Sequence, residues 1–313
     1  MNGSDDEIDR IQRRLAALRG EVGKRIVGQT DVVEQLLVCL LCDGNAVIES
    51  NPGLGKTTLI RTIAEATDLS FSRIQNTPDL MPADITGTEI IREAGGSREF
   101  VFEKGPVFAN LVLADEINRA TPKTQAALLE AMQEKQVTTA GETRELPRPF
   151  FVLATQNPID QEGTYPLPEA QTDRFLLKIL MEYPGRDEER EIVERYTTGA
   201  PDPGVDRVLS REGLQRAQHL ARQVPIADDI RDRAIDLVRA TREAENIEFG
   251  ASPRASMGLV LAAKARAFLA GRTHVSEADV EAMARPALRH RLVIDFRAER
   301  EGITPDDAVA ALL

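Results

Sequence analysis

The sequence predicts an α/β fold with a parallel sheet between helices, followed by a smaller helical domain. Short apolar segments bounded by turn or charged residues recur at α/β spacing, and their sequences are AVIES, FSRIQ, NLVLADE and FFVLATQN, with LLKILME as the expected fifth strand. Near-continuous apolar runs of this length are typical of parallel strands buried on both faces. The chain of 313 residues is 42% apolar, which is enough for a sizeable core.

Before the first strand, residues 5–22 carry Ile8, Ile11, Leu15 and Leu18 at three-to-four spacing, which predicts an amphipathic helix. A loop and a second helix follow in KRIVGQTDVVEQLLVCLL. This helix contains a C-x-x-C pair with no second pair and no nearby histidine. We therefore expect both cysteines to pack in the core, and the less favoured alternative is a redox or metal role.

Two segments interrupt the α/β pattern. TEIIREAGGSREFVFEKGP places Gly95 and Gly96 between two branched or aromatic runs, and QVTTAGETRELPRP places Gly141 between alternating runs. Both are predicted to be hairpins that project from the core.

The carboxyl-terminal third is predicted to be helical, without a strand. APDPGVDRVLS is the best linker candidate because it holds two prolines and a glycine. Three segments with helical periodicity come later, and Ser276, followed by Glu277 and Asp279, offers an N-cap with an acidic first turn. We accordingly divide the chain into a domain of residues 1–198 and a helical domain of residues 199–313.

Charge and hydropathy exclude several classes of protein. No apolar run approaches the roughly 20 residues that cross a bilayer, and the charged amino terminus has no signal-peptide segment, so we expect a cytoplasmic protein without a membrane span. The formal net charge is −12, and basic residues alternate with acidic ones along helices. Nucleic acid is therefore an unlikely partner by this interpretation, although a basic pore inside an assembly stays possible.

A phosphate-binding loop follows the first strand in SNPGLGKTT. Backbone N–H groups in such a loop curl around the anion, the lysine reaches the outer phosphates, and the hydroxyl residue binds magnesium. Gly53, Gly55, Lys56 and Thr57 meet these needs, whereas Ser50 stands where the usual pattern begins with glycine. Serine is small and tolerates turns, so we expect a modestly altered loop that still binds.

Acidic and amide side chains end the two following core strands. Asp115 and Glu116 close NLVLADE, where Asp115 can hold magnesium through water and Glu116 can polarise the attacking water. Asn157 ends the next strand and could bind the same water. Alone, each would be interpreted as a turn; after a phosphate loop in one sheet, they indicate a hydrolytic site.

The chain resembles MoxR-type AAA+ ATPases from about residue 8 to about residue 295. The resemblance is carried, in order, by RIVGQ, PGLGKTT, RIQNTPDLMPADITGTE, FEKGPVFANLVLADEINRATPKTQAALLEAMQE, FFVLATQNP, GTYPLPEAQTDRFLLKI and GASPRAS. It implies an AAA+ P-loop NTPase core with helix-2 and pre-sensor hairpin insertions, a helical lid, ATP and Mg²⁺ as cofactors, and a homo-oligomeric ring, usually a hexamer. It further implies chaperone-like remodelling of partner proteins, which in this family often carry a von Willebrand factor A domain.

The resemblance also assigns residues. It implies catalytic roles for the second Walker B acid, the sensor 1 asparagine, a trans-acting arginine finger and a sensor 2 arginine, which are Glu116, Asn157, Arg174 and Arg254. It implies nucleotide contacts from the adenine-side segment and the Walker A loop, which comprise Val27, Gly28, Asn51, Pro52, Gly53, Leu54, Gly55, Lys56, Thr57 and Thr58. Magnesium is assigned to Thr57 and Asp115, and Arg254 could act in cis or in trans.

Three positions depart from the family pattern. Ser50 and Asn51 replace part of the usual EGxPG and bear on turnover, and Asn76 replaces an apolar or aromatic residue and is expected to bear on a substrate-facing surface. Two other functions stay open: a nucleotide-gated adapter with little turnover, and a magnesium-chelatase-like or nucleic-acid motor subunit, for which Arg144 and Arg148 of the second hairpin are the relevant basic residues.

Overall fold

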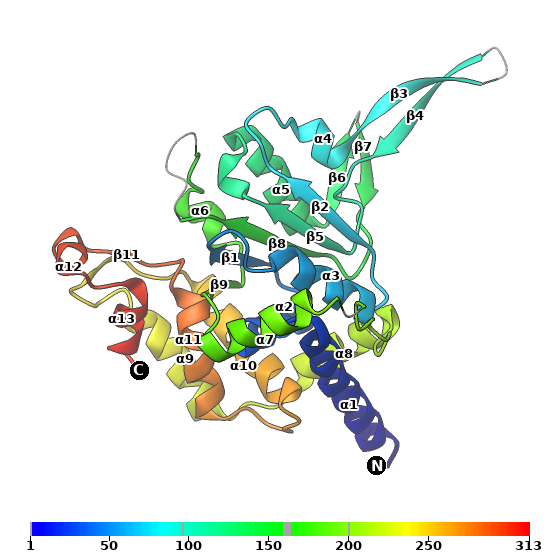
Figure 1. Cartoon of the computed structure of the whole chain (residues 1–313). Coiled ribbons are helices and arrows are strands. Elements are labelled where there is room, and N and C mark those ends of the chain that lie inside the picture. Colours follow the sequence, from blue (N-terminus) through cyan, green and yellow to red (C-terminus); the bar gives the residue numbers. More distant parts are fainter. Residues whose placement is uncertain (1, 95–96, 140, 159–163, 200) are drawn as a thin grey trace.

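A five-stranded parallel sheet lies at the centre of the computed structural model, which describes residues 2–94, 97–139, 141–158, 164–199 and 201–313 (Figure 1). Its strand order is β2 (Phe71–Gln75), β5 (Leu111–Asp115), β8 (Phe151–Gln156), β1 (Ala46–Ser50) and β9 (Leu177–Met181). All four neighbouring pairs are parallel. The predicted α/β class and the positions of all five strands are confirmed.

Both faces of this sheet are buried along its central strands, which explains the apolar residues of β5 and β8, whereas the edge strand β2 is partly exposed. Along β1, Ala46 and Ile48 enter one hydrophobic cluster while Val47 enters the other, because successive side chains alternate between faces. The first face is covered by α2 (Thr30–Cys42) and α3 (Lys56–Ala66), and α1 (Asn2–Arg25) packs on α3. The second face is covered by α4 (Pro82–Thr86) and α5 (Pro122–Glu134).

The two cysteines lie on α2 inside the first cluster. Cys39 and Cys42 are 0% and 5% exposed, and both thiols are free. Burial raises the pKa of Cys42 to about 12, so its reactive thiolate form is suppressed at neutral pH. The expectation that they serve as core residues is confirmed.

Both predicted hairpins are present. They consist of β3 (Gly87–Ala94) with β4 (Ser97–Lys104), and of β6 (Gln136–Thr139) with β7 (Glu142–Glu145). Gly95 and Gly96 lie outside the described residues, whereas Gly141 has φ +82°, which fits its place after β6. The β3–β4 hairpin extends far from the body, and β6–β7 lies near its base (Figure 1). The Arg144 guanidinium packs 4.0 Å from the Phe102 ring centroid and joins the two hairpins.

The carboxyl-terminal part is helical. It contains α8 (Arg211–Gln223), α9 (Asp228–Ala240), α10 (Pro253–Leu269), α11 (Glu277–Leu288), α12 (Phe296–Arg300) and α13 (Pro305–Ala310). A short antiparallel pair, β10 (Ile247–Phe249) with β11 (Val293–Ile294), also lies here. The expectation of no strand was wrong in this detail, because strands of three and two residues are too short to show alternation.

Asp279 is the centre of a buried hydrogen-bond network in the helical part. Its side chain is fully buried and accepts hydrogen bonds from Arg272, Ser276 and Arg266, the last at 2.8 Å. Burial opposes its ionisation, but these donors outweigh burial and lower the pKa of Asp279 to about 2. Arg266 also pairs with Glu34 at 2.8 Å, so the network connects α10 and α11 with α2.

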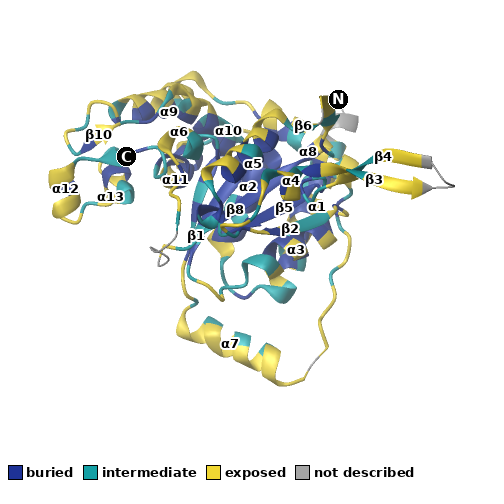
Figure 2. Cartoon of the chain, turned by 90° about the horizontal axis from the view of Figure 1, so that it is seen from above, coloured by how far each residue is buried: buried dark blue, intermediate teal, exposed yellow. Residues whose placement is uncertain are grey.

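Helix α7 (Arg186–Thr197) lies at the margin of the body, and none of its residues is fully buried (Figure 2). It is held at its last turn, where Arg195 donates to the Gly23 and Lys24 carbonyls at 3.0 and 2.9 Å and Tyr196 donates to the Arg25 carbonyl at 3.0 Å. The stretch 201–209 has neither helix nor strand, as its linker composition predicts. Within the residues described, no helix is long and apolar enough to cross a membrane.

Candidate nucleotide site

The phosphate loop connects β1 to α3 at the carboxyl edge of the sheet. Gly53 and Gly55 have φ +85° and +82°, a region that favours glycine, and a Cβ on either would meet open space. Gly55 is the N-cap of α3, so unpaired N–H groups of the first turn border the loop. A curled loop before a helix amino terminus is built to surround an anion.

Lys56 begins α3 and is half-buried. Burial lowers the pKa of its ammonium, while the charges of Asp115 and Glu116 act in the opposite direction. The lysine therefore lies within electrostatic range of both acids, although strands β1 and β5 are separated by β8. This brings together the cation and the carboxylates that the sequence assigned to one site.

Ser50 ends β1 opposite Met181 and is 3% exposed. Its hydroxyl donates to the Asn51 carbonyl at 3.2 Å. Among the described residues, the five non-glycine positions with positive φ do not include Ser50 or Asn51, so the backbone there does not require glycine. The departure from the usual motif is accommodated without left-handed strain.

Asp115 and Glu116 lie at the end of β5, where the sequence placed them. Asp115 is 8% exposed and accepts from Thr155 Oγ1 at 2.7 Å and from Arg73 Nη2 at 2.6 Å. Glu116 has φ +54°, which is uncommon outside glycine, and its backbone N–H donates to Thr155 Oγ1 at 2.8 Å. Strained backbone held by tertiary contacts is frequent at functional sites.

The Glu116 carboxylate has partners that the sequence did not indicate. Arg119 Nη1 donates to it at 3.2 Å and Gln75 Nε2 at 3.4 Å. Arg73 and Gln75 occupy alternate positions of β2, and their guanidinium and amide groups bond each other at 2.6 Å. Two polar side chains with period two on β2 were the available signal, but only the pairing of β2 with β5 shows which carboxylates they contact.

Asn157 directly follows β8, the strand between β5 and β1. The register pairs Ala114 with Ala154 and Glu49 with Gln156, so Asn157 follows at the level of the phosphate loop and of the Walker B acids. The phosphate loop, the Walker B acids and Asn157, all predicted from the sequence, therefore lie at the same end of the sheet.

Asn76 is placed differently from the expectation. It is 1% exposed, its Nδ2 donates to the Asp115 carbonyl at 2.8 Å, and its Oδ1 is buried without a hydrogen-bond partner among the described residues. The expected substrate-facing role was wrong, because Asn76 lies under the site and braces the end of β5.

A cavity of about 420 Å³ separates the phosphate loop from α7. Its walls include Val27, Leu54, Tyr183 and Ile192, which give it an apolar side next to the glycines. Gly28 has φ +64°, and a Cβ there would lie 2.3 Å from Glu188 Oε1, so α7 approaches this backbone closely. The volume is within the range of small-ligand sites. The sequence analysis did not predict that α7 lines this cavity, because helical periodicity does not show which part of the chain a helix contacts.

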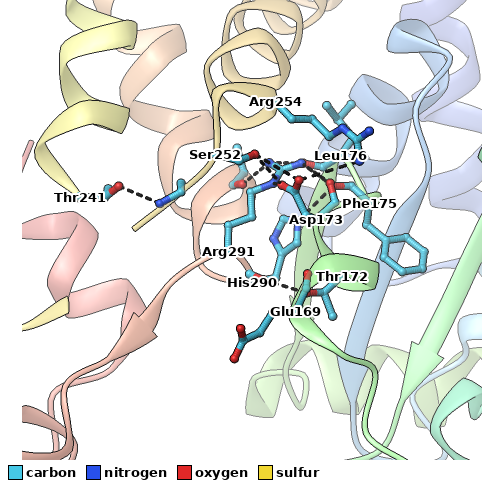
Figure 3. A network of polar contacts seen from close by, with 12 residues as sticks. Glu169, Thr172, Asp173, Phe175, Leu176, Thr241, Ser252, Arg254, His290 and Arg291 are labelled. Carbon is cyan, nitrogen blue, oxygen red and sulfur yellow. Dashed lines mark hydrogen bonds and ion pairs between the residues drawn. The ribbon is translucent and has the colours of Figure 1, made fainter. Parts of the chain in front are cut away.

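Arg174 and Arg254 lie at the opposite edge of the sheet. Leu176 N–H donates to the Asn45 carbonyl at 2.7 Å just before β9 pairs with β1, which places Arg174 near the start of β1. Arg254, the second residue of α10, forms an ion pair of 3.8 Å with Asp173 (Figure 3). Both arginines line a cavity of about 280 Å³ with Arg291 and Lys135. Five strand residues at about 3.3 Å each put this edge roughly 16 Å from the phosphate loop.

Comparisons with known proteins agree with this architecture. Residues 45–177 match the profile described as ATPase family associated with various cellular activities (AAA), and residues 239–312 match the AAA lid domain. A crystal structure of a candidate ATPase from Cytophaga hutchinsonii superposes with a TM-score of 0.93 at 40% identity, covering 99% of this chain and 96% of the other. Fold and site thus define an ATPase of the AAA class.

Full-length relatives narrow the class. The chain is 46% identical to Chaperone MoxR1 of Mycobacterium tuberculosis, over 94% of this chain and 79% of that protein. It is 41% identical to the protein YeaC of Bacillus subtilis, over 93% and 91%. Protein MoxR of Paracoccus denitrificans is 32% identical over 95% and 93%. The chain belongs to the MoxR family of AAA+ ATPases.

Proposed function

We propose that this protein hydrolyses Mg-ATP in a homo-oligomeric ring, a hexamer by the family resemblance, and couples hydrolysis to chaperone-like remodelling of partner proteins. The observation that carries the proposal is the separation of the site into two halves. The phosphate loop and the acids lie at one edge of the sheet, and Arg174 with Arg254 lies at the other. An arginine side chain is much shorter than roughly 16 Å, the length of five strand residues, so neither arginine reaches its own phosphate loop.

In this proposal Arg174 and Arg254, which lie at the amino ends of the strands, act on the nucleotide of a neighbouring subunit. Arg174 would stabilise the charge that develops on the transferred phosphoryl group, and Arg254 would act in trans beside it. Hydrolysis would then depend on assembly, because no single chain holds the whole site. Heterologous contacts of this kind, with one end of the sheet against the other, form a ring when the rotation between subunits closes.

The residues at the carboxyl edge fit a nucleotide. We infer that residues 51–58 hold the phosphates through backbone N–H groups and Lys56, and that Val27 and Gly28 border the base. Glu116 would orient and polarise the attacking water, with Asn157 bonding the same water. The tertiary partners of Glu116 and Asp115 fix both carboxylates before substrate arrives.

Magnesium fits the same edge. Both Asp115 oxygens already accept a protein hydrogen bond, from Thr155 and from Arg73, so we infer that Asp115 holds the ion through water and that Thr57 offers its hydroxyl. Mg²⁺ ordinarily keeps several waters and uses one or two carboxylates with substrate phosphates. When bound, it neutralises charge on the phosphate oxygens.

The partner is proposed to be a protein, with a von Willebrand factor A domain as the first candidate from the family resemblance. The exposed β3–β4 hairpin, with Ile91 and Phe100 at 59% and 74% exposure on paired positions, offers an apolar contact away from the nucleotide. We also retain the division at residues 198 and 199 and a cytoplasmic location as proposals.

A nucleic-acid motor is less well supported. Arg144, one of the two basic residues of the second hairpin, packs on Phe102 and donates to Glu142 at 2.6 Å. Its positive charge is therefore paired within the chain. The net charge of −12 also opposes binding to the phosphate backbone of a nucleic acid.

The test is steady-state ATP hydrolysis per subunit against protein concentration, with Arg174→Ala and Glu116→Gln as controls. We expect turnover per subunit to rise with concentration and to vanish in both variants, while each still binds ATP. A finger is worth on the order of 1,000-fold or more in turnover. Background turnover at every concentration, despite ATP binding, would support the nucleotide-gated adapter instead.

A further inference from the structure

The segment that carries Arg174 is held by the helical domain. Arg291, just after α11, has a side chain only 3% exposed, and its Nε donates to Asp173 Oδ1 at 2.8 Å. Its Nη2 donates to the backbone carbonyls of Phe175 at 2.6 Å and of Asp173 at 3.2 Å (Figure 3). One buried guanidinium thus binds the residues on both sides of Arg174.

Asp173 collects further donors from the same domain. Ser252 Oγ donates to Asp173 Oδ2 at 3.1 Å, and Arg254 pairs with this carboxylate at 3.8 Å. Figure 3 shows Ser252, Arg254 and Arg291 converging on Asp173 from the start of α10 and the end of α11. The sensor 2 candidate and the segment of the finger candidate therefore share one carboxylate.

Neighbouring contacts hold the same segment. Thr172 Oγ1 donates to the His290 carbonyl at 3.2 Å, and His290 Nε2 lies 3.0 Å from the Phe175 carbonyl. By contrast, the Arg174 side chain has no hydrogen bond or ion pair within the described part of the chain. Its position is consequently set by its own backbone, which residues 290 and 291 hold.

We propose that Asp173 and Arg291 are positioning residues through which the helical domain sets the place of Arg174. The inference rests on the proposed trans role of Arg174. It predicts that a movement of α10 and α11 in one subunit, for instance when Arg254 meets a phosphate, shifts the finger offered to the neighbour. The helical domain of one subunit would then control hydrolysis in the next.

Arg291→Lys separates positioning from simple packing. Lysine keeps the charge, but its point-like ammonium cannot reproduce the planar fork that reaches the carboxylate and two carbonyls. The matched control is Arg289→Lys, because Arg289 is also mostly buried, pairs with Asp306 at 2.8 Å and contacts the Lys178 carbonyl instead of residues 172–176. Asp173→Asn is the second variant, and it changes the acceptor instead of the donor.

The first readout is independent of catalysis. In nucleotide-free protein, hydrogen exchange of residues 172–177 should accelerate about tenfold in Arg291→Lys and in Asp173→Asn, and stay unchanged in Arg289→Lys. Turnover should then fall about tenfold or more in the first two variants with the KM for ATP within about twofold, since a misplacement of about 1 Å can cost on the order of 100-fold. Equal effects of Arg291→Lys and Arg289→Lys would overturn the proposal.

Mixed assemblies provide the second readout. Glu116→Gln subunits carry an intact finger, so mixing them equally with Arg291→Lys subunits should restore about a quarter of the sites in a head-to-tail ring. Mixing Arg291→Lys with Arg174→Ala should restore none, because both lack a working finger. The opposite pattern would refute the positioning role.

The two proposals fail differently. Full turnover in Arg174→Ala would remove the finger assignment itself. Lost turnover in Arg174→Ala, together with unchanged turnover in Arg291→Lys and Asp173→Asn, would leave the finger intact and reject only the positioning inference.

Discussion

Replacing Asp279 with asparagine should weaken the helical domain in a pH-dependent way. The Asp279 carboxylate is fully buried among Arg266, Arg272 and Ser276, and its pKa falls from 3.8 to about 2. At somewhat more than 1 kcal/mol per pKa unit, ionised Asp279 contributes on the order of 2 kcal/mol to the free energy of unfolding at neutral pH. Because the pKa is lowered on folding, this contribution is complete above the unfolded value and is lost as pH falls toward about 2.

The assay is urea unfolding followed by far-ultraviolet circular dichroism, since the chain has no tryptophan. We expect Asp279→Asn to lower the free energy of unfolding by about 2 kcal/mol at pH 7. The difference in unfolding free energy between wild type and variant should narrow by about 1 kcal/mol between pH 5 and pH 3. The exposed Asp229→Asn serves as control, with an effect within about 0.5 kcal/mol at both pH values. A gap that stays constant with pH would show that the Asp279 network does not favour the charged form, and the reasoning would fail.

Three further predictions concern the nucleotide site. Lys56→Ala should abolish ATP binding in calorimetry without unfolding the chain, because the loop loses its cation; retained affinity would contradict the assignment. Ser50→Gly should change turnover by less than about twofold, since the backbone at Ser50 is not left-handed and gains nothing from glycine. It should lower the free energy of unfolding by about 1 kcal/mol, because glycine adds conformational entropy to the unfolded chain. A large gain in turnover would mean that Ser50 slows the enzyme. Ile192→Ala should raise the Kd for ATP about tenfold through loss of apolar contact from α7, and equal affinity would exclude α7 from the base pocket.

Local sequence determined the strands and the phosphate loop. Short segments with apolar residues at α/β spacing predicted β1, β2, β5, β8 and β9, because burial of a parallel sheet leaves a signal in each strand separately. The hairpin glycine Gly141 and the glycines of the loop were recognisable for a similar reason, since positive φ is a requirement at a single residue.

Tertiary structure decided what these elements face. Arg73 is 42 positions from Asp115, and only the pairing of β2 with β5 makes them partners. The strand order separates Arg174 from its own phosphate loop, and the packing of α11 brings Arg291 onto the same segment, 118 positions from Asp173. Contacts of this kind depend on register and on packing between distant segments, which no periodicity within one segment encodes. The sequence by itself named the parts of an ATP site, and the fold divided them between two edges of one sheet.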